Sequence, residues 1–209
     1  MMQPDQLQSQ SGTNGNPQQV AQLTERAQNG DRAAFEQLVN LFHEEIFRMV
    51  YYRTRSRMDA EDLTQDIFLL VYRNLAGLKD IDRFRPWIFS IAVNRVRDFN
   101  RKKRILTFFS FSNEEGGDLD IPDSEIHDDP GVLQQLMNHE FWAQVKRLSD
   151  KLSSVEREVF FLRFMDHLSI KEISEVLNKS ESAVKTHLYR SIKKFKEDSA
   201  FLQMLKGDV

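Results

Sequence analysis

Residues 168–196 constrain the fold more than any other stretch, because they have the pattern of two amphipathic helices joined by a tight turn. Ser169 and Glu172 have the spacing of a capping box at the start of the first helix, and apolar residues then recur at helical intervals. Three turn residues follow, the last of which, Ser180, can cap the second helix. Two helices separated by so short a turn predict a helix-turn-helix.

The outward face of the second predicted helix is polar and basic. Between Glu181 and Glu197 the chain has five Lys or Arg and two Glu. In a DNA-binding helix-turn-helix the second helix enters the major groove, with base edges and phosphates as its two kinds of contact. An ordinary solvated helix with no role in DNA binding is the alternative interpretation. The DNA contacts expected on this face are Ser182, Lys185, Thr186, Tyr189, Arg190 and Lys193, with Lys194 as a further phosphate contact.

The composition of the whole chain limits the remaining possibilities. A chain of 209 residues with 40% apolar content can build one or two small cores. The net charge is −3, so any electrostatic footprint for nucleic acid must be local. The absence of cysteine excludes disulfides and thiolate chemistry. No long apolar run and no signal-peptide pattern is present, so we expect a cytoplasmic protein without membrane insertion.

The residue types that support catalysis do not form recognisable constellations. There is no glycine-rich phosphate loop, and the five histidines lack metal-ligand spacing. The carboxylates are plentiful, but none has partners typical of an acid and base pair. The sequence therefore predicts no enzyme, no cofactor and no metal site.

The first half of the chain begins with a polar tail and continues with amphipathic helices. Residues 1–19 are rich in Gln, Asn, Ser, Gly and Pro, so we expect them to be a disordered tail. Asp31 can cap a helix that continues to about Tyr52, and a second helix begins at Asp59 and ends at Gly77. Each has one apolar face, which predicts a shared core.

The outward face of the second of these helices combines acidic and apolar side chains. Acidic residues in the first turns favour the positive end of the helix dipole, and this explains part of the pattern. A mixed acidic and apolar patch farther along the helix suits docking to a basic protein partner. Both interpretations stay open on the residues alone. The candidate partner contacts are Glu61, Asp62, Gln65, Asp66 and Leu69.

A third helix in this half, expected from about Arg83 to Arg104, is strongly basic. Pro86 fits its first turn, and six basic residues against one Asp lie between Arg95 and Arg104. Aromatic rings beside cations can bind single-stranded DNA, although rings at helical spacing more often pack in a core. The residues considered for DNA contact here are Arg83, Trp87, Asn94, Arg97, Arg101 and Lys102.

A segment without periodicity joins the two halves. Eight Asp or Glu and no Lys or Arg in residues 113–130 predict a flexible acidic linker over residues 107–131. It is either a solvated spacer or an imitation of nucleic-acid charge that shields the basic helices. We therefore expect an all-α protein with a helical bundle at 20–106, a four-helix domain at 132–198 containing the helix-turn-helix, and a fraying end at 199–209.

Three stretches, in this order and spacing, resemble the extracytoplasmic-function sigma factors of bacterial RNA polymerase. The first half carries DAEDLTQDIFLLVYRNL and FRPWIFSIAVNRVRDFNRKKR, and the second carries LSSVEREVFFLRFMDHLSIKEISEVLNKSESAVKTHLYRSIKKF. Together they cover most of residues 30–197. The resemblance implies a sigma region 2-like bundle followed by a sigma region 4-like helix-turn-helix domain. It also implies a protein that brings polymerase to a promoter and helps to open the DNA, without a catalytic step of its own.

The same resemblance implies roles for the candidate surfaces. The Asp62 to Leu69 face would dock on the clamp helices of the largest polymerase subunit, and the basic helix would contact the −10 element. The loop at residues 76–82 would capture an extruded base of the non-template strand. The helix-turn-helix would read the −35 element, and an anti-sigma factor would cover the docking faces. The chain departs from many relatives at Asn178, where they have glycine.

Two other classes of protein are compatible with parts of the pattern. A stand-alone helix-turn-helix regulator would need a dimer interface or a receiver domain, and the first half has no parallel-strand pattern or phosphoacceptor cluster. An interaction module, such as an anti-sigma factor or adaptor, would leave the basic faces without a DNA role. The preferred hypothesis is a sigma factor that is monomeric when free and binds core RNA polymerase and promoter DNA.

Overall fold

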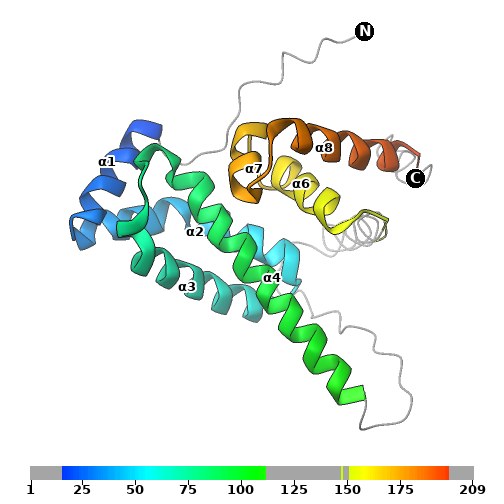
Figure 1. Ribbon diagram of the computed structural model, residues 1–209. Coiled ribbons are helices and arrows are strands. Elements are labelled where there is room, and N and C mark those ends of the chain that lie inside the picture. The colour runs from blue at the N-terminus through cyan, green and yellow to red at the C-terminus, as the bar shows by residue number, and fades with distance from the viewer. Residues whose placement is uncertain (1–15, 112–146, 148–150, 198–209) are drawn as a thin grey trace, which may run out of the picture. The chain divides into compact units, whose positions relative to one another are not determined.

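The computed structural model describes residues 16–111, 147 and 151–197, and every regular element among them is helical (Figure 1). The chain divides into two helical units. The predicted all-α class is therefore confirmed for the described residues. None of the described helices combines the length and the apolar character needed to cross a membrane.

The first unit begins its helices at side-chain caps. Asp31 accepts a hydrogen bond from the Ala34 amide at 3.1 Å, as the sequence predicted, and Ser56 accepts one from the Asp59 amide at 3.2 Å. The elements of this unit are α1 (Pro17–Gln28), α2 (Arg32–Thr54), α3 (Arg57–Asn74), the 3-10 turns η2 (Leu75–Gly77) and η3 (Ile81–Arg83), and α4 (Phe84–Phe111).

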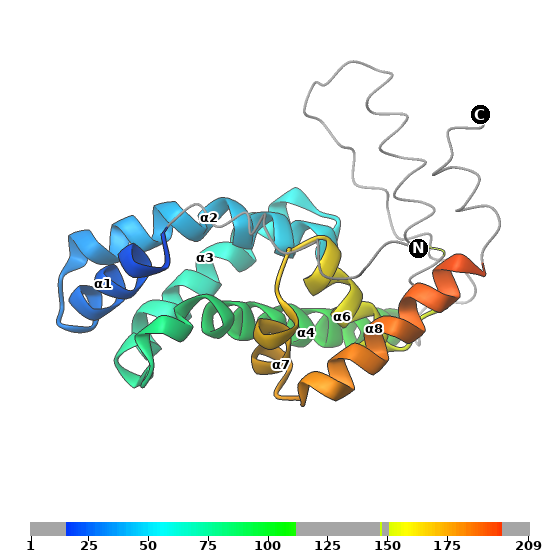
Figure 2. The same cartoon turned by 90° about the horizontal axis from the view of Figure 1, so that it is seen from above.

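Helix α2 supplies the centre of the first unit, because it packs against α1, α3 and α4. Both views show α2 running alongside α1 and α3 (Figures 1 and 2). Phe42 of α2 meets Phe84 of α4 edge to face, with ring centroids 5.2 Å apart. Large side chains without solvent exposure complete this core, among them Ile46, Met49, Ile67, Ile88 and Phe89.

A buried ion pair ties the start of α4 to the middle of α2. The guanidinium of Arg85 lies 2.5 Å from Oε1 of Glu45, and both side chains are less than a tenth exposed. Arg85 also lies over the ring of Phe89, 5.2 Å from its centroid. Because a buried charge needs a partner, this contact fixes the position of the start of α4 against α2.

A single side chain of α1 holds the connection between α3 and α4. Nε2 of Gln28 donates hydrogen bonds to the carbonyl oxygens of Leu75 at 2.9 Å and of Leu78 at 2.7 Å. Leu78 lies in the loop at residues 76–82 that the family resemblance associates with base capture, and Leu75 directly precedes that loop. The last turn of α1 therefore sets the position of this connection.

The second unit contains α6 (Ser154–Phe164), α7 (Ile170–Leu177) and α8 (Glu181–Lys196). The capping box predicted at Ser169 is formed, and Ser153 forms another with Glu156 at the start of α6. Helices α6 and α8 pack together, and the rings of Phe160 and Phe195 stack with centroids 4.2 Å apart.

The turn between α7 and α8 explains how the chain manages without a glycine there. Asn178 has φ of 50°, in the left-handed region, where asparagine is the best tolerated residue after glycine. Ser180 then accepts a hydrogen bond from the Ala183 amide at 3.2 Å. The predicted helix-turn-helix is thus present, with the expected cap.

Several predicted boundaries are wrong. Residues 17–19 were expected in the disordered tail, but Asn16 caps α1 and Pro17 occupies its first turn, so they are helical. The predicted linker from residue 107 overlaps α4, which continues to Phe111. Helix α3 begins two residues before Asp59 because Ser56 is its cap.

Other predictions lie outside the described residues. These are the tail before residue 16, most of the acidic linker, the C-terminal end, and the first of the four helices expected from residue 132, apart from Arg147, which is helical.

Candidate nucleic-acid and protein interfaces

The outer face of α3 presents a continuous stripe of apolar and polar side chains. Its positions are spaced by four, three, four and three residues, which is the spacing of a helix seam that packs on other helices. Met58, Leu69 and Tyr72 are 71%, 52% and 53% exposed, unusually open for large apolar residues. The stripe consists of Met58, Asp62, Gln65, Leu69 and Tyr72, and we call it the α3 stripe.

The acidic residues beside and within the α3 stripe differ in their partners. Glu61 pairs with Arg57 at 3.0 Å, whereas Asp62 forms no ion pair with any described residue. Asp66 is bound to Arg95 of α4 and is only partly exposed. Of the five predicted partner contacts, four are exposed and Asp66 is half-buried.

An apolar groove of about 530 Å³ adjoins the α3 stripe, between α2 and α3. Phe35 and Tyr72 meet edge to face across it, with centroids 5.0 Å apart. Gln65, Leu69 and Tyr72 belong to both the groove and the stripe. The groove lining also includes Val39, His43, Thr64 and Phe68.

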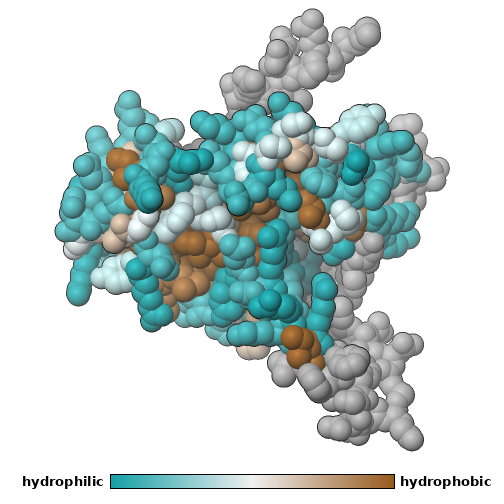
Figure 3. Space-filling model, viewed as in Figure 1, coloured by the Kyte–Doolittle hydropathy of each residue, from teal (hydrophilic) through white to brown (hydrophobic). Residues whose placement is uncertain are grey.

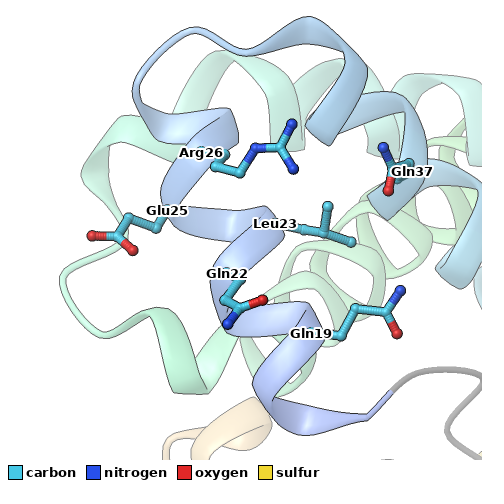
Figure 4. A pocket seen from close by; sticks show the side chains of 6 residues that line it. All are labelled: Gln19, Gln22, Leu23, Glu25, Arg26 and Gln37. Carbon is cyan, nitrogen blue, oxygen red and sulfur yellow. The ribbon is translucent and has the colours of Figure 1, made fainter.

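A second hollow, of about 310 Å³, lies between α1 and α2 (Figure 4). Gln19 and Leu23 point toward α2, whereas Glu25 points away from it (Figure 4). Arg26 is already bound to Asp31 at 2.6 Å. The remaining lining is mainly neutral and polar, so this hollow offers no set of groups for chemistry or for a charged ligand.

The outward side of α4 is basic, as predicted. Asn94, Arg97, Arg101 and Lys102 are all exposed. Arg101 is paired with Asp98 on its own helix at 3.1 Å, while Lys102 has no ion pair within the described part of the chain. Figure 3 shows hydrophilic side chains over much of the lower part of α4.

The two predicted contacts at the start of this helix are placed differently from the rest. Arg83 lies in η3, just before α4, and is exposed. Trp87 is half-buried, with its ring 6.0 Å from that of Phe84. Trp87 is thus partly packed and partly exposed, so the core and surface interpretations of Trp87 each describe part of it.

Six of the seven predicted DNA contacts on α8 are exposed, and Lys194 is the exception. Tyr189 is 71% exposed, which no packing role in this unit explains. Lys185 and Lys193 make only long, solvent-exposed contacts to Glu181 at 4.0 Å and Glu197 at 3.8 Å, and such pairs contribute little. The exposed set is Ser182, Lys185, Thr186, Tyr189, Arg190 and Lys193.

The prediction that Lys194 contacts phosphate is not supported by its surroundings. Its Nζ lies 2.7 Å from Oε2 of Glu156 and 3.2 Å from the carbonyl oxygen of Lys151. The hydrogen bond from Lys194, followed by that from the Ser153 amide, holds the pKa of Glu156 below its usual value. Lys194 therefore joins α8 to α6 rather than extending the basic surface.

Three side chains in these surfaces were missed from the sequence. Met58 and Tyr72 complete the α3 stripe, and extending the seam spacing by one step at each end would have found them. Arg95 was missed because nothing local in the sequence shows that it reaches Asp66, 29 residues earlier. Within residues 16–111, 147 and 151–197, no group of acidic or histidine side chains could hold a metal ion.

Comparison with known proteins assigns both units. Residues 38–105 match the family model of sigma-70 region 2, and residues 142–195 match that of sigma-70 region 4. The fold resembles that of CnrH solved in complex with the cytosolic domain of CnrY, with a TM-score of 0.63 and 24% identity over 91% of this chain and 99% of CnrH. It also resembles RpoE in complex with the anti-sigma factor NepR from Bartonella quintana, with a TM-score of 0.55 and 17% identity over 78% of this chain and 94% of that one.

Three proteins with similar sequences are RNA polymerase sigma factors. The ECF RNA polymerase sigma factor BldN of Streptomyces coelicolor is 33% identical over 83% of this chain, which spans 63% of BldN's length. SigW of Bacillus subtilis, an ECF sigma factor, is 28% identical over 82% of this chain and 91% of its own length. The RNA polymerase sigma factor CnrH of Cupriavidus metallidurans is 30% identical over 81% of this chain and 88% of its own. The chain therefore belongs to the extracytoplasmic-function sigma factors, which direct bacterial RNA polymerase to promoters.

Proposed function

We propose that this sigma factor binds core RNA polymerase through the α3 stripe and contacts promoter DNA through α4 and α8. The observation that carries the proposal is the opposite character of two neighbouring helices in the first unit. Helix α3 presents an acidic and apolar seam, whereas the outward side of α4 is basic. One rigid unit can thus bind a protein helix and a nucleic acid at once.

The α3 stripe suits a helical, basic partner. Its seam spacing matches helix-on-helix packing. The carboxylate of Asp62, which has no ion pair with the residues that the structure describes, can receive a partner cation. The exposed areas of Leu69 and Tyr72 supply apolar burial in the same contact. The clamp-helix coiled coil of the largest polymerase subunit is the partner that fits this chemistry.

On α4, the proposed role is contact with the −10 element and support of strand opening. Arg97, Arg101 and Lys102 would bind phosphates, and Asn94 would reach a base or a sugar. The exposed part of Trp87 would lie against the opened duplex. Arg83, exposed at the start of this surface, would add a further phosphate contact.

On α8, the proposed role is recognition of the −35 element. Lys185 and Thr186 lie in the N-terminal half of the helix, which is the part that meets base edges in this motif. Arg190 and Lys193, farther along, would bind phosphates, and Ser182 and Tyr189 complete the surface. The alternative function, that of a stand-alone helix-turn-helix regulator, loses its support because the similar proteins are RNA polymerase sigma factors.

Three further expectations belong to this proposal. The chain would catalyse no bond change itself and would act in the cytoplasm, where polymerase works. It would also be held inactive by an anti-sigma factor, as suggested by the solved complexes of CnrH with CnrY and of RpoE with NepR. Such a factor would compete with polymerase for the α3 stripe.

Reconstitution with core polymerase and a library of promoter DNA tests the proposal, with transcript starts mapped. Asp62→Lys should weaken core binding at least tenfold, because like charges placed face to face cost several kcal/mol. The matched control is Glu44→Lys, which makes the same charge change at an exposed site of α2 away from the stripe. Equal core binding by both variants would refute the docking face.

A further inference from the structure

An ion pair connects the two proposed binding surfaces of the first unit. Asp66, beside the α3 stripe, is bound to the guanidinium of Arg95 on α4. A second pair, between Asp59 and Lys103 at 3.3 Å, joins the same helices farther along. Since the earlier residue of α3 pairs with the later residue of α4, the two helices run antiparallel along this contact.

The two side chains of the first pair are not equally accessible. The side chain of Asp66 is 46% exposed, whereas that of Arg95 is 26% exposed. Asp66 follows Asp62 by one turn and precedes Leu69 by one turn, so it borders the surface proposed for polymerase. A cation on a docked partner can therefore approach the Asp66 carboxylate while Arg95 is still bound to that carboxylate.

Arg95 also lies in line with the basic surface of α4. It precedes Lys102 by seven residues, and residues seven apart share one side of a helix. Lys102 is exposed and has no ion pair within the described residues. Arg95 is thus two turns from a proposed DNA contact, with its charge neutralised by Asp66.

We propose that Arg95 is a further DNA-contacting residue, which Asp66 holds in the free protein and releases when polymerase docks on α3. The inference rests on the proposed docking face. A basic group of the partner competes for the Asp66 carboxylate, and Arg95 then gains a phosphate as its new counter-ion. Docking and DNA binding are in this way coupled through one pair of charges.

The coupling has a physical advantage for a dissociable subunit. A carboxylate that is ion-paired with a cationic side chain reduces the number of phosphates that the free chain can neutralise. Phosphate contacts dominate the affinity for DNA that does not depend on sequence. Once polymerase is bound, the same cation contributes to the promoter complex. Free chains therefore bind bare DNA less well than the assembled enzyme does, without any large conformational change.

The salt dependence of DNA binding tests the inference on the free full-length chain, with a labelled duplex of mixed sequence as the probe. Asp66→Asn should steepen the slope of log affinity against log salt by about 0.9, the value for one more phosphate contact. It would then lose about threefold more affinity than the wild type between 50 and 200 mM salt. The double variant Asp66→Asn/Arg95→Gln should return to the wild-type slope.

The matched control is Asp62→Asn, which removes the same charge one turn away but releases no cation. It should leave the slope unchanged. If Asp62→Asn and Asp66→Asn steepen the slope equally, or if the double variant keeps the steeper slope, the gain is general electrostatics and Arg95 has no part in it. Hydrogen exchange of α3 and α4 amides checks that each variant stays folded.

A second arm uses the reconstituted holoenzyme and does not depend on the Asp66 variant. Arg95→Gln should lower the salt slope by about 0.7 to 0.9 in the holoenzyme and leave that of the free chain unaltered. An equal change in both, or in neither, contradicts the release. Failure of the docking proposal is seen separately, because Asp62→Lys would then leave core binding intact whatever the free-chain slopes are.

Discussion

Lys194 of α8 donates a 2.7 Å hydrogen bond to Oε2 of Glu156, the same oxygen that accepts the Ser153 amide in the capping box of α6. The Glu156 carboxylate thus completes the N-terminal cap of α6 and also anchors α8. The side chain of Glu156 is only 7% exposed, so its charge depends on these donors for stabilisation. The orientation of α8, which carries the proposed −35 surface, follows from this contact.

Glu156→Gln should destabilise the second unit by about 1.5–3 kcal/mol, the usual range for hydrogen bonds to a charged group. The pKa of Glu156 is lowered in the folded state, so the unfolded state binds more protons at acidic pH. The stabilisation is therefore complete above the ordinary glutamate pKa and is lost as the pH falls through the lower folded-state value. Hydrogen exchange of α6 and α8 amides, measured against pH, records both effects.

Lys193→Gln serves as the control for that experiment. Lys193 is adjacent to Lys194 in the chain but makes only a 3.8 Å contact to exposed Glu197. It should leave the protection of α6 unchanged. A Glu156→Gln protein with wild-type protection and the same pH profile would show that the contact adds nothing to the unit.

Removing one partner of the buried pair in the first unit should have a larger effect. Glu45→Ala leaves the guanidinium of Arg85 in the core without its carboxylate, which should cost about 3–5 kcal/mol. Urea unfolding followed by Trp87 fluorescence, in a Trp142→Phe background, reports on the first unit alone.

The matching double variant, Glu45→Leu/Arg85→Met, should recover much of the lost stability. Replacing both charged side chains with apolar ones leaves no unpaired charge in the core. If Glu45→Ala and the double variant are equally unstable, the loss comes from packing rather than from an unpaired charge.

How far the sequence predicts this protein depends on whether the relevant signal is local. Capping residues are local, so Asp31, Ser169 and Ser180 were identified correctly as helix starts. The exposed faces of α3 and α8 follow from helical periodicity and were also identified. Boundaries failed where a less conspicuous cap, such as Asn16 or Ser56, preceded the expected one.

Side-chain partners between helices could not be predicted in the same way. Lys194 looked like part of the basic face because its neighbours are basic, yet its partner Glu156 lies 38 residues earlier. Arg95 and Asp66 are likewise distant in the chain. Periodicity gives the side of a helix but not the distance to a charge on another helix, so these assignments required coordinates.

The exposed residues of α8 should separate into two functional groups. Thr186→Ala should alter preference at one position of the −35 element and leave salt dependence unchanged, as expected for a residue that reads a base edge. Arg190→Ala should weaken binding to all sequences about equally and reduce the salt slope by about 0.9, as expected for a phosphate contact. Holoenzyme binding to a library of −35 variants at several salt concentrations measures both quantities.

The hydrogen bonds from Gln28 lead to a prediction about promoter opening. Gln28→Ala removes both donors to the carbonyl oxygens of Leu75 and Leu78, which should loosen the connection between α3 and α4. Since that connection is expected to hold an extruded base, open-complex formation should slow while binding of core polymerase and closed promoter stays normal. A base-analogue fluorophore placed in the −10 element follows opening directly. Gln22→Ala, on the same helix but in the hollow between α1 and α2, is the control. Equal opening rates for the two variants would mean that the α1 contact supports the fold and plays no part in melting the DNA.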